Sequence, residues 1–300
     1  MTQFVENLMN RASKLNKTIA LAEGTDVRAA KAAEILTKKG VCKVVLIGNE
    51  DEIKAKFPEI DFTGVSFDDP KTSDHRADYA NTLFELRKAK GMTEEQALNI
   101  VTTNNMFYAC VALKRGDVDG VVGGAVFSSA DVSRAAFQVI KAAPGISSVS
   151  SCFVMVPPED FKYKKYPAYI FSDCAVIPYP TSDQLSDIVV AAADSAKKIC
   201  EMEPKIAMLS FSTKGSAKHE AIDKVRAAYE KVKAEHPEIK VDGELQLDAS
   251  LVDSVAAQKA PGSEVAGQAN VLVFPNLDAG NIGYKIAQRL GGFTAIGPVL

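Results

Sequence analysis

The stretch "FPNLDAGNIGYK" (residues 274–285) joins an apolar run to a helical pattern, and this junction decides the fold. The run "VLVF" (271–274) has the composition of a buried strand and stops at Pro275, while "NIGYKIAQRL" (281–290) has helical spacing. A turn of small and polar residues lies between them. Because ligands of open α/β sheets bind beyond the carboxyl ends of the strands, we expect this turn to line a pocket for a phosphorylated ligand.

The same succession of an apolar run and an amphipathic segment recurs along the chain. The other apolar runs include "KTIALAEG" (17–24), "CKVVLIG" (42–48), "DGVVGGAV" (119–126), "KIAMLSFS" (205–212) and "FTAIGPVL" (293–300). One helix is predicted over residues 180–200, because a capping-box spacing opens that segment and a single apolar stripe follows it. Continuous apolar strands separated by helices indicate an α/β fold with mainly parallel sheets covered on both faces.

A domain boundary is predicted where a helical run ends in Pro144-Gly145 and an apolar, β-rich run begins. We therefore expect two α/β domains, residues 1–145 and 146–300, with the last residues returning to the first domain. Two such domains that face each other across a cleft could direct loops from both toward one ligand.

Composition limits the possible functions. The net charge of −3 is spread along 300 residues, which argues against a nucleic-acid or membrane-surface protein. No apolar run approaches the roughly 18 residues of a membrane span, and the N-terminus lacks the apolar core of a signal peptide. The five cysteines show no C-x-x-C pair. We expect a cytoplasmic protein with reduced thiols and no membrane or nucleic-acid partner.

The segment "VVGGAVFSSADVSR" (121–134) has features of an anion site. Two glycines follow the predicted strand, Ser128 and Ser129 stand at a helix start, and Arg134 lies one turn further on. Helix N–H groups, hydroxyls and an arginine suit a phosphate group. The alternative is that Ser129 only caps the helix and that Arg134 is a solvated side chain.

Two more turns repeat this arrangement. In "LSFSTKGSAKHE", Ser212, Thr213 and Lys214 follow an apolar run and precede a helix. The opening stretch supplies Asn281 and Lys285. Each turn could be an ordinary helix cap, but three such turns in one chain favour a shared anionic ligand.

The sequence gives little support for a metal site or for a catalytic nucleophile. In "DGELQLDASL", alternation places Asp242, Glu244 and Asp248 on one face, which is more typical of a wet sheet edge than of a metal cage. The three histidines lack ligand spacing. Walker, dinucleotide-fingerprint and nucleophile-elbow motifs are absent from the sequence. We expect no metal and no tightly bound cofactor.

Five long segments, in order, resemble the phosphate acetyl/butyryltransferase family, whose members include the phosphate acetyltransferases. They are "GVVGGAVFSSADVSRAAFQVI" (120–140), "FSDCAVIPYPTSDQLSDI" (171–188), "KIAMLSFSTKGSAKHE" (205–220), "DGELQLDASLV" (242–252) and "KAPGSEVAGQANVLVFPNLDAGNIGYKIAQRLG" (259–291). The resemblance implies reversible transfer of an acetyl group between coenzyme A and inorganic phosphate, with acetyl-CoA, phosphate and acetyl phosphate as substrates. It also implies direct attack in a ternary complex, an active site in the cleft between two α/β domains, a fold similar to isocitrate and isopropylmalate dehydrogenases, and a homodimer.

Carried over by position, the family's cleft arginines fall on Arg87, in "ELRKAKG", and on Arg134, for which we expect a catalytic role. The hydroxyl, amide and ammonium groups of the three turns are then substrate-binding candidates. They are Ser128, Ser129, Ser212, Thr213, Lys214, Asn281 and Lys285.

One difference from the family affects the general base. Family members continue beyond the "AIGPVL" equivalent into a segment that carries the aspartate thought to act on the thiol, so this base has no counterpart in residues 1–300. We expect a polypeptide that ends at Leu300 to have little transferase activity. Three alternatives stay open at this stage: phosphate butyryltransferase, a dehydrogenase of the isocitrate-like fold, and a non-catalytic module that senses acetyl-CoA.

Overall fold

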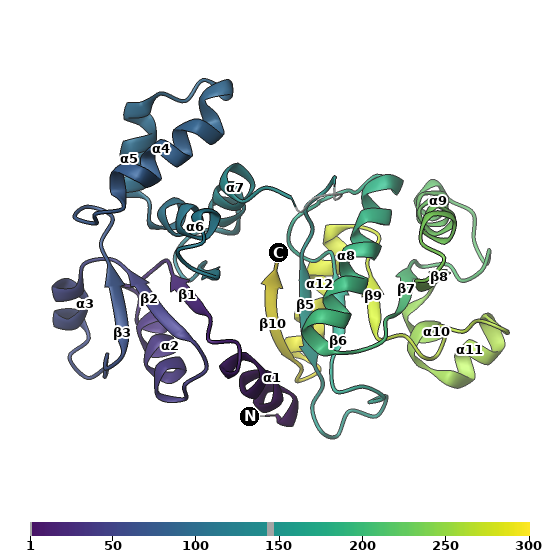
Figure 1. Cartoon of the computed structure of the whole chain (residues 1–300). Helices are drawn as coiled ribbons and strands as arrows, with labels where there is room; N and C mark the ends of the chain where they lie inside the picture. The colour runs from purple at the N-terminus through teal and green to yellow at the C-terminus, as the bar shows by residue number, and fades with distance from the viewer. Residues whose placement is uncertain (1, 143–146) are drawn as a thin grey trace. The chain divides into compact units, whose positions relative to one another are not determined.

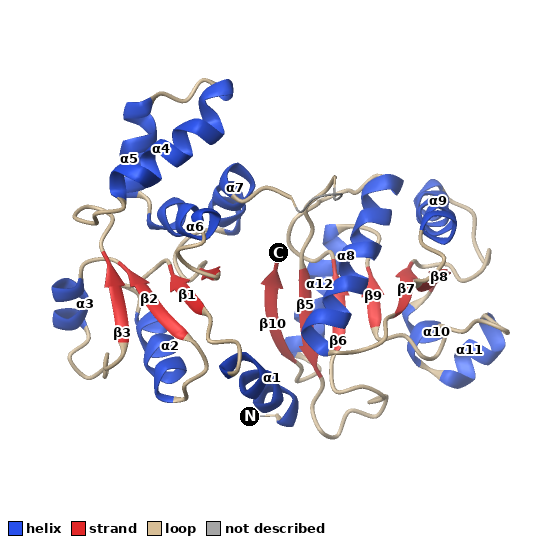
Figure 2. Ribbon diagram, viewed as in Figure 1, coloured by secondary structure: helices blue, strands red, loops and turns tan. Residues whose placement is uncertain are grey.

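A computed structural model describes residues 2–142 and 147–300. It divides the chain into two compact units, Met1–Lys141 and Ala142–Leu300, which are coloured by position in Figure 1. The predicted boundary at residues 144–145 lies outside the described residues. Each unit combines a β-sheet with helices (Figure 2), so the predicted α/β class is confirmed.

The first unit is built on a parallel sheet with strand order β3-β2-β1-β4. Its elements are α1 (Gln3–Ser13), β1 (Thr18–Leu21), α2 (Val27–Lys38), β2 (Lys43–Ile47), α3 (Glu50–Lys56), β3 (Val65–Asp68), α4 (Arg76–Arg87), η1 (Lys88–Lys90), α5 (Glu94–Thr103), α6 (Asn105–Arg115), β4 (Gly120–Val122) and α7 (Ser129–Val139).

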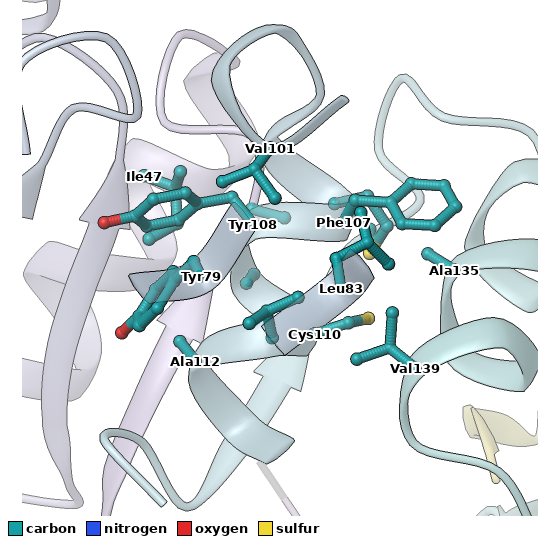
Figure 3. Packing of buried hydrophobic residues seen from close by; sticks show 14 of the residues in the cluster. Ile47, Tyr79, Leu83, Val101, Phe107, Tyr108, Cys110, Ala112, Ala135 and Val139 are labelled. Atoms are coloured by element: carbon teal, nitrogen blue, oxygen red, sulfur yellow. The ribbon is translucent and has the colours of Figure 1, made fainter. Parts of the chain in front are cut away.

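Alternate residues of this sheet face two layers of helices. Leu21 and Leu46 pack with apolar residues of α2 and α3. Ala20 and Ile47 lie in the opposite core, which α4, α5, α6 and α7 complete. Figure 3 shows how the side chains of this second core meet, with Tyr108 among those that are fully buried. Because strand side chains alternate between faces, continuous apolar strands of this kind require cover on both sides.

The second unit is built on a mixed sheet with strand order β10-β5-β6-β9-β7-β8. Its elements are β5 (Cys152–Val156), β6 (Tyr169–Ser172), α8 (Ser182–Cys200), β7 (Lys205–Leu209), α9 (Glu220–Glu235), β8 (Lys240–Leu245), α10 (Leu247–Leu251), α11 (Asp253–Lys259), β9 (Val271–Val273), α12 (Leu277–Arg289) and β10 (Thr294–Val299).

The strands β6, β9, β7 and β8 are parallel, whereas β5 pairs antiparallel with both β6 and β10. Ala207 and Leu209 of β7 face the core that α10, α11 and α12 cover. Ile206 and Met208 alternate with them, and both are fully buried, with α8 and α9 in contact with the strand.

Two predictions about particular elements can be compared with this arrangement. The helix expected over residues 180–200 is confirmed as α8, and Thr181 and Gln184 form its capping box. Residues 294–299, which we expected to return to the first domain, instead form β10 and pair with β5 of the second unit. An apolar strand at the chain end gains backbone partners from the open edge of β5. Within the described ranges, no helix is both long and apolar enough to cross a bilayer.

Candidate active site

In the first unit, Ser128, Ser129 and Arg134 follow β4, which is a parallel neighbour of β1. Parallel neighbours end at the same edge of a sheet, so the loop after β4 lies beside the loop after β1. The segment after β4 leads directly into α7, which carries Ser129 and Arg134.

Ser128, not Ser129, caps α7. The Oγ atom of Ser128 accepts a hydrogen bond from the backbone N–H of Asp131 at 3.2 Å and donates one to the Asp131 carboxylate at 2.7 Å. Ser129 is the exposed first residue of the helix. Arg134 is also exposed, with Nη1 2.8 Å from Oδ1 of Asp131. A surface ion pair of this kind is weak, which leaves the guanidinium able to exchange Asp131 for another anion.

The loop between β4 and α7 closes around the carboxylate of Glu23, which follows β1. Four successive backbone N–H groups, those of Gly124, Ala125, Val126 and Phe127, donate to it at 2.8, 2.8, 2.5 and 2.6 Å. Glu23 is only 7% exposed. Burial opposes its ionisation, but the four N–H groups outweigh that effect and lower the pKa of Glu23.

Arg87 is the last residue of α4, and α4 packs against α7 in the same core. Its side chain is half-buried, and its buried Nε atom has no hydrogen-bond partner among the described residues. A buried guanidinium nitrogen without a partner is costly unless a ligand or water supplies an acceptor.

In the second unit, the loops after β6, β7 and β9 share one edge, because these strands are parallel. Asp173 follows β6 and is 3% exposed. It accepts hydrogen bonds from the Ser151 hydroxyl at 2.5 Å and from the backbone N–H groups of Ala175 at 3.0 Å and Ile177 at 2.7 Å. The loop after β6 is therefore fixed by the carboxylate at its own start.

The turn after β7 is held by a side chain of the neighbouring strand, β8. The buried carboxylate of Glu244 accepts hydrogen bonds from the Ser212 hydroxyl at 2.8 Å and the Gly215 N–H at 2.9 Å, and Arg226 binds it through Nε at 2.8 Å and Nη2 at 3.1 Å. Burial disfavours the charged form of Glu244, yet these donors, with Arg226 the strongest, lower its pKa to about 2.

These contacts change the expectation for the hydroxyl-rich turn. Ser212 is fully buried, and Thr213 exchanges hydrogen bonds with the side chain and backbone of Gln246. The ammonium group of Lys214 binds Asp242. All three side chains hold the turn together in this structure, because each of them makes a hydrogen bond to a neighbouring residue.

The wet edge predicted for the acidic segment is wrong for two of its three carboxylates. β8 is indeed an edge strand, but Asp242 and Glu244 are buried because Lys214 and Arg226 cover them. Asp248 lies outside the strand, in α10, and pairs with Lys259 at 2.9 Å. Among the described residues, no group of three or more His, Cys, Asp or Glu side chains could hold a metal ion.

The small residues of the opening stretch let α12 approach the loop after β6. A Cβ atom on Gly280 would lie 2.2 Å from the carbonyl oxygen of Asp173. The Asn281 amide donates to the Cys174 carbonyl oxygen at 3.1 Å, and Lys285 donates to the Asn281 side chain at 2.8 Å. Asn276 caps the helix. Close packing thus explains most of this composition without a ligand.

One further cation reaches the same edge of the second sheet. The ammonium group of Lys224, from α9, donates to the carbonyl oxygen of Pro275 at 2.8 Å. Burial lowers the pKa of Lys224. Like Glu23, Asp173 and Arg226, this residue was not singled out from the sequence. An acidic residue directly after an apolar run was visible for Glu23 and Asp173, but which N–H groups it would bind depends on the strand order.

Comparison with known proteins identifies the class to which this pair of α/β units belongs. The sequence profile of the family described as "Phosphate acetyl/butaryl transferase" matches residues 3–300. The chain belongs to this family, which confirms the resemblance found in the sequence.

The relatives match almost the whole chain. A phosphate acetyltransferase from Thermoanaerobacterium thermosaccharolyticum is 47% identical over 295 residues, which are 98% of this chain and 89% of the relative. A phosphate acetyltransferase from Bacillus subtilis is 43% identical over 302 residues, 100% of this chain and 90% of the relative. The crystal structure of a phosphotransacetylase from Streptococcus pyogenes has a TM-score of 0.90 at 39% identity and covers 100% of this chain and 90% of its own.

Proposed function

We propose that this protein is a phosphate acetyltransferase, which converts acetyl-CoA and inorganic phosphate reversibly into acetyl phosphate and CoA. The observation that carries the proposal is the match of residues 3–300 to the family, together with relatives of that name at 47% and 43% identity. No tightly bound cofactor takes part, and CoA is a substrate.

The reaction is a direct transfer in a ternary complex. A phosphate oxygen attacks the thioester carbonyl carbon, a tetrahedral oxyanion forms, and the C–S bond breaks as the thiolate leaves. In the reverse direction the thiol must lose its proton, and an unperturbed thiol has a pKa of about 8.5. The protein has to supply cations for phosphate and donors for the oxyanion.

Arg134 is the proposed catalytic residue, and Arg87 the proposed second ligand of the anionic substrates. Both guanidinium groups can bind two oxygens of one phosphate. Support comes from the weakly paired, exposed position of Arg134 and from the Nε atom of Arg87 that has no partner among the described residues.

The remaining proposed substrate-binding residues divide into two groups. Ser128, Ser129, Lys214, Asn281 and Lys285 are at least partly exposed and can bind a ligand through small rotations. Ser212 and Thr213 would first have to exchange internal hydrogen bonds. We propose that these two act by shaping the turn that bears Lys214.

At the level of the whole protein, we propose a cytoplasmic homodimer. The relatives of the same name are bacterial enzymes. All five cysteines are described, and each is a thiol, as a reducing compartment requires.

The test is phosphate-dependent release of thiol from acetyl-CoA, compared with butyryl-CoA. It is run on the 300-residue chain and on the chain extended by the C-terminal segment of a relative, because the family resemblance implies that the base lies there. We expect the extended chain to turn over acetyl-CoA faster than butyryl-CoA. Arg134→Ala should lower kcat/KM about a hundredfold. Arg76→Lys is the control and should leave kcat/KM unchanged, because Arg76 lies at the end of α4 opposite to Arg87.

Other results would redirect the assignment. Faster turnover of butyryl-CoA would make the protein a phosphate butyryltransferase. Binding of acetyl-CoA without turnover by either polypeptide would favour a sensor module and would overturn the proposed reaction.

A further inference from the structure

The donors to the carboxylate of Glu23 are all consecutive backbone groups of one loop, whereas Asp173 also binds the Ser151 hydroxyl and Glu244 also binds Arg226. All four N–H groups from Gly124 to Phe127 point at the Glu23 carboxylate, two on each oxygen. A carboxylate offers about four lone-pair sites, so this set saturates it. The protein's own side chain therefore fills a concavity that would otherwise bind an anion.

Besides Glu23, the loop is held by Phe127, which packs against the core of the first unit. Gly124 has φ of +105°, which the turn requires, and Val126 is 72% exposed. A second contact comes from Arg28, whose guanidinium donates to the carbonyl oxygen of Ala125 and pairs with Asp26 at 2.9 Å. Arg28 is an exposed surface residue. Among the described residues, Glu23 is the acceptor for all four of these backbone N–H groups.

The loop ends at Ser128, the cap of α7, and that helix carries Arg134 in its second turn. A change in the loop therefore moves the first turn of α7 and the ion pair between Asp131 and Arg134. We propose that Glu23 is a positioning residue, which fixes the loop of residues 124–127 and through it places Ser128 and Arg134 for the phosphate substrate. The kinetic part of this inference rests on the proposed function.

Replacement by glutamine tests the inference with almost no change of size. The amide oxygen of Glu23→Gln accepts from two N–H groups at most, and its NH₂ group faces the other two, donor against donor. Glu23→Asp keeps the charge but is one methylene shorter, so it should reach only one pair of N–H groups. This second variant retains a buried carboxylate, which keeps the test usable if the glutamine variant fails to fold.

Two controls separate positioning from loss of stability. Glu34→Gln removes a carboxylate that also accepts a backbone N–H, from Asp61, but lies on α2 away from the loop. Ile60→Val weakens the core between the sheet and α2 without touching the loop.

The first measurement is amide hydrogen exchange at residues 124–127 in the full chain. We expect exchange at least tenfold faster in Glu23→Gln, intermediate in Glu23→Asp, and within about twofold of the parent in both controls. Unchanged exchange in the two Glu23 variants would overturn the inference.

The second measurement is kcat and KM for phosphate in the acetyl-transfer assay. We expect Glu23→Gln to lower kcat at least tenfold with KM changed less than threefold, because a displaced Arg134 fails mainly in the transition state. Kinetics equal to those of Ile60→Val would reduce Glu23 to a structural role and overturn the proposed placement of Arg134. If no form of the protein transfers acetyl groups, the proposed function fails, and the exchange result alone decides whether Glu23 holds the loop.

Discussion

Three carboxylates show how single residues organise this protein. Glu23, Asp173 and Glu244 are each less than 10% exposed, and each accepts hydrogen bonds from a loop that follows a strand. Desolvation of a charge is expensive, so such groups persist only where several donors compensate. Here the compensation also fixes the loops.

The first residue-scale prediction concerns Glu244 and pH. Its pKa of about 2 in the folded chain lies below the ordinary value of 4.5, so its stabilising effect is fully present above pH 4.5 and is lost as the pH falls toward 2. The shift corresponds to roughly 3 kcal/mol. Glu244→Gln should therefore be less stable than the parent near neutrality and lose less stability on acidification. Urea unfolding near neutral pH and at about pH 3 checks this.

Glu264→Gln is the control, because Glu264 is an exposed carboxylate of the same unit. Its free energy of unfolding should equal that of the parent at both pH values. If the free energy of unfolding falls equally on acidification in Glu244→Gln and in the parent, the assigned role of Glu244 is contradicted.

A second prediction distinguishes Ser128 from its neighbour. Ser128→Ala removes the cap of α7 and should lower the free energy of unfolding by about 1 kcal/mol. Ser129→Ala changes an exposed first-turn residue and should alter it by less than about 0.5 kcal/mol. Thermal or chemical unfolding of the two variants gives the comparison, and a larger loss for Ser129→Ala would refute the assignment of the cap.

At the scale of elements, the junction of β9 and α12 is shaped mainly by packing. The helix starts at the edge of the sheet, and its small residues let it lie against the backbone that follows β6. A sequence that looks like a binding loop can therefore be a contact between elements. Lys285 and Asn281 remain at this contact with partly exposed side chains.

Gly280→Ala tests that contact. Alanine is favoured over glycine in a helix by about 1 kcal/mol, but its Cβ would lie 2.2 Å from the Asp173 carbonyl oxygen. We expect a net loss of about 1–3 kcal/mol in the free energy of unfolding. Gln288→Ala, on the same helix and half-exposed, should change it by less than about 0.5 kcal/mol. A stabilised Gly280→Ala variant would show that the helix does not approach Asp173 this closely.

At the scale of the whole molecule, each unit has its own apolar core. Leu83 belongs to a core made only of residues from the first unit, and Leu272 to one made only of residues from the second. Separate cores of this kind allow separate unfolding.

Leu83→Ala should therefore act on one unit. Leu83 is fully buried, so the substitution should cost about 2–5 kcal/mol. Hydrogen exchange resolved along the chain should speed up in the helices around this core and stay near parent rates in β7 and β9. Leu15→Ala, which alters a 64% exposed side chain, is the control. Equal acceleration in both units would mean that they unfold together.

The sequence allowed prediction of the features that depend on local pattern. Alternating apolar runs and helical stripes predicted the α/β class, and the capping box predicted α8. Contacts between residues that depend on the order of the strands in the sheet could not be predicted from the sequence. Glu244 was assigned to a wet edge because alternation places it on one face with other polar residues, yet Arg226, 18 positions earlier in a helix, covers it. The pairing of β10 with β5, which the sequence did not predict, also depends on strand order.

The family assignment makes one claim that can be measured directly, namely that this protein joins an acetyl group to phosphate. The measurement is phosphorus NMR of a mixture of acetyl-CoA, inorganic phosphate and the chain bearing a relative's C-terminal segment. We predict a growing acetyl phosphate signal matched by an equal amount of free CoA thiol, and strong suppression of both in Arg134→Ala. Thiol release without acetyl phosphate, or no release with either acetyl-CoA or butyryl-CoA, would contradict the account.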